Sequence, residues 1–211
     1  LPEMRSRLTE AAIAAGRALG LAPMEDINDP QDRERIGYAP RTIWKGKRQS
    51  AANAFLHPVA GRPNLTVRTG VLVDRVTFDG TRATGVAATV DGTPTTFTAR
   101  REVILSAGTH ASPAILQRSG VGDAAHLKAL EVPVVADRPG VGQNLFEHRG
   151  LVFQWRVPDS LSQNREFRGL HLVASVLRYY LTHRGAMAGG AYDMAAYAKS
   201  DPSLDRPDLQ L

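Results

Sequence analysis

Apolar residues recur at helical intervals near the start of the chain, at Leu8, Ala11, Ile13, Ala15 and Leu19. This spacing predicts an amphipathic helix over residues 6–19, and Gly20 follows as a stop signal. Residues 22–40 contain Pro and Asp without a sustained period, so we expect an irregular or extended chain there. A second helix is predicted from about residue 50 to residue 56, ending before Pro58.

From Asn64 onward the helical spacing gives way to patches of alternation that are typical of strands. The stretch is rich in Val, Leu, Thr and Phe, which favour β-structure. Two Asp-Gly pairs, Asp79-Gly80 and Asp91-Gly92, punctuate it. Because tight hairpin turns need the positive φ angles that such pairs supply, residues 71–98 are predicted to form a three-strand antiparallel meander.

A strand, a turn of small residues and a short helix are predicted in the middle of the chain. Residues 103–105 (Val-Ile-Leu) form a continuous apolar run, as in a strand buried on both faces of a layered sheet. The small residues 106–108 follow, so the surface of another molecule could approach the backbone there. A helix is then expected from Ser112 as the N-cap, Pro113 in the first turn and Gly120 just past the end.

The last third of the chain mixes both kinds of pattern. Residues 139–142 (Pro-Gly-Val-Gly) predict a tight, ordered loop. Residues 151–157 and 191–198 are expected to form strands, and residues 170–181 have the spacing of a helix. The whole sequence therefore predicts a mixed α/β (α+β) chain, with part of a layered sheet, the meander and further antiparallel strands.

The formal net charge is +5, and nucleic-acid binding depends on clustered Lys and Arg. The arginines are scattered among 21 acidic residues. One dense basic patch has a single interleaved aromatic, Trp44, and consists of Arg41, Lys45, Lys47 and Arg48. A solvated basic face is the favoured interpretation of this patch, so no nucleic-acid partner is expected.

Composition limits other classes of protein as well. The chain has no Cys, which excludes disulfides and thiolate metal sites. No apolar stretch approaches the roughly 20 residues that a membrane-spanning helix needs, so no span is expected. Residues 1–20 lack the pattern of an export signal, which leaves a cytoplasmic setting as the default expectation.

One long motif lies at residues 108–122, which read Gly-Thr-His-Ala-Ser-Pro-Ala-Ile-Leu-Gln-Arg-Ser-Gly-Val-Gly. This run resembles the second signature of the glucose-methanol-choline (GMC) oxidoreductases. Flanking stretches agree with that family in order and spacing: Gly46–Ser50 with Phe55–Leu56, then Arg62–Val67, then Pro139–Leu145. Over about residues 20–148 the chain resembles an internal segment of a bacterial choline dehydrogenase-like alcohol oxidoreductase.

The resemblance implies that the chain contributes to an FAD site. In the family, the small-residue turn after the buried strand lies against the adenosine half of FAD, and the backbone of a strand valine meets the adenine edge. These roles would fall here to Ala107 and Gly108, and to Val73. Backbone N–H and C=O groups suit an adenine edge because they offer a donor and an acceptor without loss of side-chain entropy. From its strand alone, Val73 would be interpreted as an ordinary buried valine.

The resemblance also implies a division into domains. Residues 1–45 and 151–211 would belong to an antiparallel-sheet substrate domain, and residues 46–150 to the FAD-binding layered-sheet domain. The family's G-x-G-x-x-G fingerprint, which holds the pyrophosphate at a helix N-terminus, has no counterpart in residues 1–40. Its catalytic base is a His in the C-terminal part, paired with a second His or an Asn, and no segment here resembles that motif. No catalytic residue is therefore assigned, and metal ligands are not expected.

Two histidines lie within or beside the matched motifs. His110 occupies a variable position of the signature, and Glu147-His148 stands where relatives usually have Asp-His, which puts the hydrogen bond of that acid in doubt. The implied activity is oxidation of a small-molecule alcohol, by proton removal and hydride transfer to flavin, together with the remainder of the parent chain. The chain alone is expected to be inactive. The alternative is a truncated, non-catalytic module that binds no FAD and acts through a partner surface.

Overall fold

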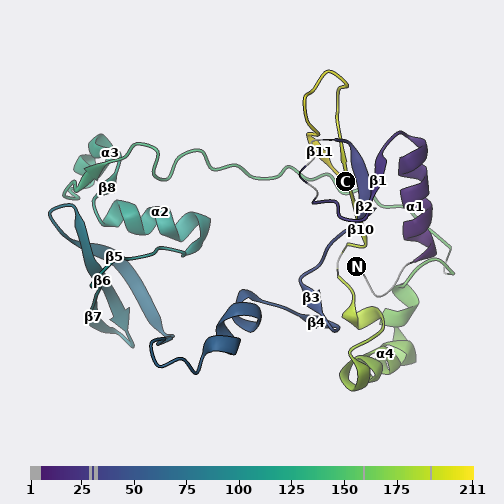
Figure 1. Cartoon of the computed structure of the whole chain (residues 1–211), viewed down its shortest axis with the longest axis horizontal. Helices are drawn as coiled ribbons and strands as arrows, with labels where there is room; N and C mark the ends of the chain where they lie inside the picture. Colours follow the sequence, from purple (N-terminus) through teal and green to yellow (C-terminus); the bar gives the residue numbers. More distant parts are fainter. Residues whose placement is uncertain (1–5, 29, 31–32, 159, 191) are drawn as a thin grey trace. The chain divides into compact units, whose positions relative to one another are not determined.

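The computed structural model of the chain (Figure 1) describes residues 6–28, 30, 33–158, 160–190 and 192–211. The chain forms two compact units. Unit 1 combines residues 1–62 with residues 153–211, and unit 2 consists of residues 63–152. Unit 1 is therefore assembled from two stretches that are far apart in the sequence, whereas unit 2 is one continuous stretch.

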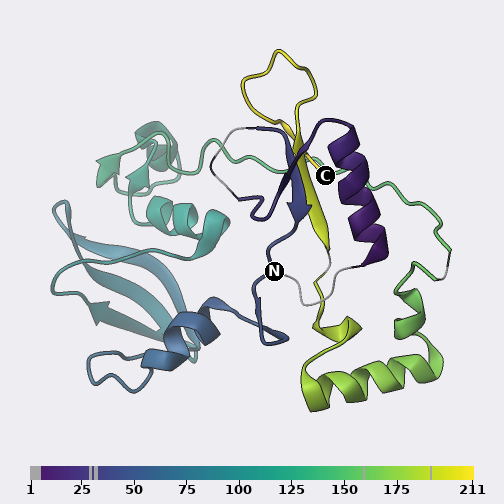
Figure 2. The ribbon, with the colours of Figure 1, turned by 45° about the vertical axis from the view of Figure 1, so that its right-hand side comes forward.

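A four-stranded sheet forms the centre of unit 1 (Figure 2). In spatial order its strands are β1 (Ala22–Met24), β2 (Arg35–Tyr38), β10 (Met194–Ala198) and β11 (Leu209–Gln210). β1 and β2 pair in parallel, and β10 pairs antiparallel with both β2 and β11. Ile27, Ile36 and Ala196 are buried around it. The antiparallel strand predicted at residues 191–198 is confirmed as β10, and residue 191 itself lies outside the described residues.

Helix α1 (Arg7–Ala18) packs against this sheet. Ser6 caps the helix, because its Oγ accepts a hydrogen bond from the Thr9 N–H at 3.0 Å, an arrangement worth about 1 kcal/mol. Gly16 allows the close approach, since a Cβ at that position would lie 2.5 Å from Cδ1 of Ile36. The predicted N-terminal helix is confirmed.

The connection that follows β2 contains four short elements: β3 (Ile43–Trp44), β4 (Lys47–Arg48), the π-helix η1 (Ala52–Leu56) and the 3₁₀ helix η2 (His57–Val59). The predicted second helix is confirmed as η1, which ends at Leu56 before Pro58 as predicted. Pro58 lies in the first turn of η2. Its missing N–H costs little there, since the first N–H groups of a helix have no intrahelical partner, and the helical path continues.

Helix α4 (Gly169–Thr182) confirms the helix predicted over residues 170–181. The 3₁₀ helices η3 (Asn164–Phe167) and η4 (Ala186–Ala188) flank it. The buried Ser175 donates a hydrogen bond to Oε2 of Glu166 at 2.9 Å, which ties α4 to η3. Within the described part of the chain, no helix is long and apolar enough to cross a membrane.

The connection between β10 and β11 is held by serine–aspartate hydrogen bonds. Ser203 donates from its Oγ and its N–H to Asp201, at 2.6 and 2.8 Å, and Ser200 donates in the same way to Asp208, at 2.6 and 2.7 Å. These bonds, those from the serine side chains first, lower the pKa of both exposed carboxyl groups below the usual value. Their contribution to holding the loop is therefore present at neutral pH and lost as the pH falls through the lowered pKa.

Unit 2 begins with an antiparallel sheet whose strands lie in the order β5 (Val71–Asp79), β6 (Arg82–Val90) and β7 (Thr93–Thr98). Gly80 has φ 57° in the first turn, and Asp91 and Gly92 have φ 48° and 82° in the second. The predicted meander and both of its turn positions are confirmed. The β5–β6 register shifts between Val73 and Arg75, so β5 carries a bulge just after Val73.

Helix α2 (Gly108–Arg118) follows the meander, with β8 (Val121–Gly122), α3 (Ala124–Ala129) and β9 (Ala136–Asp137) after it. The prediction that Ser112 is the N-cap is wrong, because α2 begins at Gly108 and contains Pro113. Ser112 instead reaches back, and its Oγ accepts a hydrogen bond from the Ala107 N–H at 2.9 Å. The lost N–H of Pro113 costs only one hydrogen bond near the start of the helix. The predicted end is confirmed, with Gly120 at φ 84° just past it.

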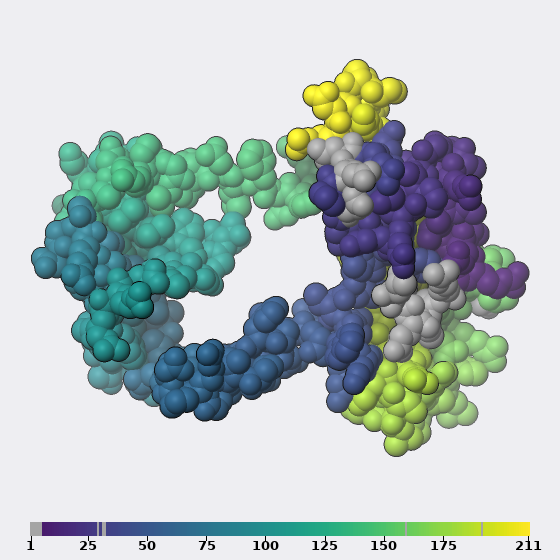
Figure 3. Space-filling view, viewed as in Figure 1, coloured from purple at the N-terminus to yellow at the C-terminus, as the bar shows by residue number. Residues whose placement is uncertain are grey.

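Two predicted strands are not formed. Residues 151–157 run as irregular chain, and Leu151 and Trp155 are 84% and 80% exposed. Figure 3 shows the green stretch near residue 150 as a thin, extended segment. Residues 103–105 are also irregular, and Ile104 is 77% exposed rather than buried. Both predictions are wrong for the same reason. A strand forms only where a neighbour supplies hydrogen-bond partners, and no described strand pairs with either stretch.

The C-terminal end of α2 is fastened to β5 through Ser119. Its buried Oγ donates to the Ile115 carbonyl at 2.5 Å and accepts from the N–H of the buried Val76 at 2.8 Å. Arg118 adds hydrogen bonds from Nε to the backbone carbonyl and Oδ1 of Asp74, at 2.9 and 3.1 Å. The hydroxyl of Ser119 thus accepts the hydrogen bond of the Val76 N–H, on an edge strand of the sheet.

Replacing Ser119 with alanine is expected to destabilise unit 2 by about 1–3 kcal/mol, because the Val76 N–H loses its partner in a buried position. Chemical denaturation followed by circular dichroism measures the loss. Ser112→Ala is the matched control, since the Ser112 hydroxyl serves an exposed N–H, and it should cost less than Ser119→Ala. Equal losses of unfolding free energy in the two variants would show that the buried hydrogen bond contributes no more to stability than the exposed one.

Candidate functional site

The predicted cofactor contacts Ala107 and Gly108 lie at the start of α2, and both are exposed. Gly108 has φ 86°, a conformation that residues with a Cβ rarely adopt. A Cβ added to Gly108 would meet no heavy atom of the chain within 4 Å. Packing within the protein therefore does not demand a glycine at this position. The backbone there is open to an incoming molecule.

Val73, the third predicted contact, lies on β5 and is half-buried. It pairs with Ala88 of β6 immediately before the bulge at Asp74. β5 is an edge strand of the meander, and it is the strand on which α2 packs. The structure thus places Val73 on an element packed against α2, although no hydrogen bond between described residues joins Val73 to Ala107 or Gly108.

A cavity of about 480 Å³ adjoins the same helix within unit 2. One side of α2 lines it, at helical spacing, with Thr109, His110, Pro113, Ala114 and Gln117. The opposite wall is the loop of residues 142–146, which Gln117 holds by donating from Nε2 to the Val141 carbonyl at 3.3 Å. The residues on each wall were visible in the sequence, but their meeting depends on how the loop folds back on the helix.

A second cavity, of about 760 Å³, lies within unit 1. Its wall includes Arg41, which the sequence grouped with a solvated basic face. That interpretation is wrong for Arg41, whose side chain is only 17% exposed and forms an ion pair with Asp193. It holds for Lys45, Lys47 and Arg48, which are exposed. The pair joins residues 152 positions apart, so no local pattern could have indicated it.

No group of three His, Cys, Asp or Glu side chains among the described residues could hold a metal ion. The candidate site is thus an open backbone surface at Ala107 and Gly108, with a cavity on the same helix. Such a surface suits a large organic ligand that is recognised through backbone groups and shape.

The chain matches the GMC oxidoreductase family over residues 2–150. Mouse mitochondrial choline dehydrogenase is 38% identical over 203 residues, which cover 96% of this chain and 34% of that protein. An oxygen-dependent choline dehydrogenase from Burkholderia vietnamiensis is 37% identical over 204 residues, which cover 96% of this chain and 36% of that protein.

Solved structures agree with the sequence relatives. A formate oxidase variant from Aspergillus oryzae superposes with a TM-score of 0.82 at 27% identity, covering 93% of this chain and 34% of that one. An FAD-dependent oxidoreductase from Chaetomium thermophilum gives a TM-score of 0.76 at 27% identity, covering 93% and 35%. The chain spans about a third of the length of these relatives.

These similarities confirm the predicted mixed α/β fold class and the resemblance on which the sequence predictions rested. FAD, the predicted cofactor, is named for both structural neighbours. Because the match to the family covers well over half of the chain, the chain belongs to the GMC oxidoreductase family.

Proposed function

We propose that this protein takes part in FAD-dependent oxidation of a small-molecule alcohol. In this proposal Ala107 and Gly108 lie against the adenosine half of FAD, and the backbone of Val73 meets the adenine edge. The observation that carries it is the conformation of Gly108, which is open to solvent at φ 86° inside the matched signature. When bound, FAD supplies the acceptor for the hydride that leaves the alcohol carbon.

The residues of this chain support binding and orientation in the proposal. The Ala107 N–H is already engaged by Ser112, which fixes the turn before a ligand arrives. A turn fixed in advance binds with a smaller loss of conformational entropy. The small side chains at 107 and 108 leave room for a flat ring system to approach the backbone.

The two compact units support a division of labour. Residues 46–150 are proposed to belong to the FAD-binding domain, and residues 1–45 and 151–211 to the substrate domain. The compact units follow this division at the second boundary, whereas residues 46–62 pack with unit 1. The cavity of about 760 Å³ in unit 1 has the size of a small-molecule site. The names of the choline dehydrogenases and the formate oxidase reported above refer to small substrates. This is consistent with a small-molecule site in unit 1.

The test is to purify the complete gene product and, separately, the 211-residue chain, and to record visible absorbance and alcohol-dependent reduction of an artificial electron acceptor. We expect the complete product to carry flavin and to oxidise at least one small alcohol. The 211-residue chain alone is expected to show no turnover. A complete product that carries no flavin and reduces no acceptor would instead favour the alternative, a module that acts only through a partner surface.

A further inference from the structure

Residues 151–157 (Leu-Val-Phe-Gln-Trp-Arg-Val) carry a run of large apolar side chains that lie in solvent. In addition to Leu151 and Trp155, Val152 is 85% exposed and Phe153 is 67% exposed. Single exposed apolar residues are normal on a protein surface, but a contiguous apolar stretch marks a place where another surface binds. The backbone of this stretch indicates what kind of surface that is.

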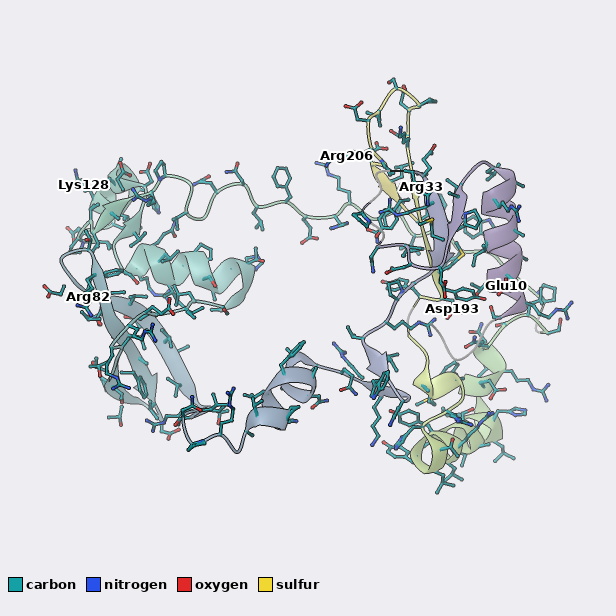
Figure 4. The ribbon with its side chains drawn as sticks, in the orientation of Figure 1. Glu10, Arg33, Arg82, Lys128, Asp193 and Arg206 are labelled. Atoms are coloured by element: carbon teal, nitrogen blue, oxygen red, sulfur yellow. The ribbon has the colours of Figure 1, made fainter. Side chains whose placement is uncertain are left out.

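The backbone of residues 151–157 is extended. Phe153 and Trp155 stack, with ring centroids 5.9 Å apart and an interplanar angle of 24°. Side chains two positions apart meet on one side of an extended chain, whereas in an α-helix they do not face each other. Figure 4 shows side chains on both sides of the thin green stretch near residue 150, as an extended chain places them. None of residues 151–157 has a positive φ, so the backbone can enter a strand without passing through a strained conformation.

The sequence of the stretch is that of a strand with one apolar side. The odd-numbered residues from 151 to 157 are Leu, Phe, Trp and Val, and Gln154 and Arg156 stand between the last three. Aromatic and β-branched residues favour strands. Pro158 ends the pattern, since proline has no N–H to donate to a neighbouring strand. The stretch lacks only a neighbour with which to pair.

The missing neighbour is evident in the hydrogen bonds. Among the described residues, no backbone–backbone hydrogen bond involves an N–H or C=O group of residues 151–157, and no described sheet includes them. The N–H and C=O groups of an extended segment fit the edge of a β-sheet, whose own outward groups are equally unpaired. A lipid surface would cover the apolar side chains but offer these backbone groups no partners. The stretch therefore fits a sheet edge.

A second apolar surface in unit 1 indicates that the partner is a sizeable piece of protein. One side of helix α4 consists of exposed apolar residues at intervals of three and four positions: Leu170, Val173, Leu177 and Leu181. A helix that is apolar on its outer side as well is normally buried by further protein. This chain spans about a third of the length of its relatives, so a parent chain of their length has residues enough to cover both surfaces.

We propose that residues 151–157 are a docking strand for the remainder of the parent chain. They pair with a sheet edge formed by residues of the complete gene product outside the 211-residue chain, and Phe153 and Trp155 add two rings to the apolar face of that sheet. Within the 211 residues the stretch stays irregular because no edge is supplied to it. This docking goes beyond the proposed function, because it requires neither FAD nor an alcohol.

The first test places a photoreactive p-benzoylphenylalanine in place of Gln154 in the complete gene product, on the polar side of the stretch. We expect irradiation to join position 154 to a peptide of the same chain that lies outside the 211 residues, identified by mass spectrometry of a digest. A cross-link to another of the 211 residues, or a cross-link between two copies of the protein, would overturn the proposal.

Hydrogen exchange of the complete gene product gives an independent measurement. The amides of residues 151–157 that pair with the sheet edge should exchange about a hundredfold or more slowly than those of an unstructured chain, at every protein concentration. Trp155→Ser, which removes a ring from the apolar side, should reduce this protection several-fold. Gln154→Ser is the matched control, because it changes the opposite side, and it should leave the protection unchanged.

Unprotected amides in the unaltered protein would show that the stretch stays in solvent, and the proposal would be wrong. Protection that is lost on dilution would assign the stretch to a second copy instead, and protection that appears only with phosphatidylcholine vesicles would assign it to a lipid surface. Equal losses of protection in Trp155→Ser and Gln154→Ser would contradict the apolar face. Flavin content and turnover of the same preparation are measured separately, so a failure of the proposed function is distinguished from a failure of the docking.

Discussion

Replacing Gly108 with valine is expected to lower the FAD content of the complete gene product about tenfold or more, with only a small loss of folding stability. A branched Cβ would occupy the open surface that we assign to the adenosine half of FAD, and each 1.4 kcal/mol of lost binding free energy is a factor of ten. Within the protein the new side chain meets nothing within 4 Å. The stability cost is therefore limited to backbone strain at φ 86°, about 1–2 kcal/mol.

The measurements are the ratio of flavin to protein absorbance and the thermal midpoint of the apoprotein. Gly92→Val is a close control, because Gly92 has nearly the same φ, 82°, and equally open surroundings, but lies in the β6–β7 turn. Both variants should lose similar stability, and only Gly108→Val should lose flavin. Wild-type flavin content in Gly108→Val would remove Gly108 from the cofactor site.

Replacing Gly46 with alanine is expected to destabilise unit 1 by about 3 kcal/mol or more, the largest stability effect among the substitutions considered. Gly46 is buried at φ 71° in the β3–β4 turn, and a Cβ there would overlap the carbonyl oxygen of His183. Backbone atoms on both sides cannot rotate away as a flexible side chain could. The strain of a positive φ adds to the overlap.

Chemical denaturation of the wild type and the variant measures this loss. Gly61→Ala is the control, since a Cβ at Gly61 would meet no heavy atom within 4 Å and the residue has no positive φ, and it should change stability by less than about 0.5 kcal/mol. A Gly46→Ala variant as stable as Gly61→Ala would mean that the His183 backbone moves aside at little cost, and that this approach is not needed for the fold.

Local sequence patterns were sufficient to predict an element wherever its hydrogen bonds or turn angles depend only on residues of the same segment. Helices α1 and α4 were predicted because their hydrogen bonds lie within one segment and their apolar spacing marks the packed face. The meander was predicted because its turns depend on positive φ at Gly80, Asp91 and Gly92, which residue type indicates directly. The signature at residues 108–122 indicated the family without any knowledge of the fold.

Partners far away in the sequence decided the rest. The apolar run at residues 103–105 has the composition of a buried strand, but a strand needs a neighbour to pair with its N–H and C=O groups, and none is described beside it. Helix α2 begins at Gly108 and not after Ser112. The Ser112 hydroxyl accepts a hydrogen bond from the Ala107 N–H and does not cap the helix, although serine favours N-cap positions.

The cavity in unit 1 is the clearest product of tertiary structure. Arg41 was predicted to lie on a solvated basic face, and no pattern in the sequence singled out Asp193. They become a partly buried ion pair because β2 and β10 lie side by side, which brings positions 38 and 194 into register and the neighbouring loops together. Sequence determined which segments could form helices, turns and a family signature, because these depend on neighbours along the chain. The pairing of distant charges, and with it the chemistry of the cavity, depended on the fold, because the strength of an ion pair is set by distance and burial.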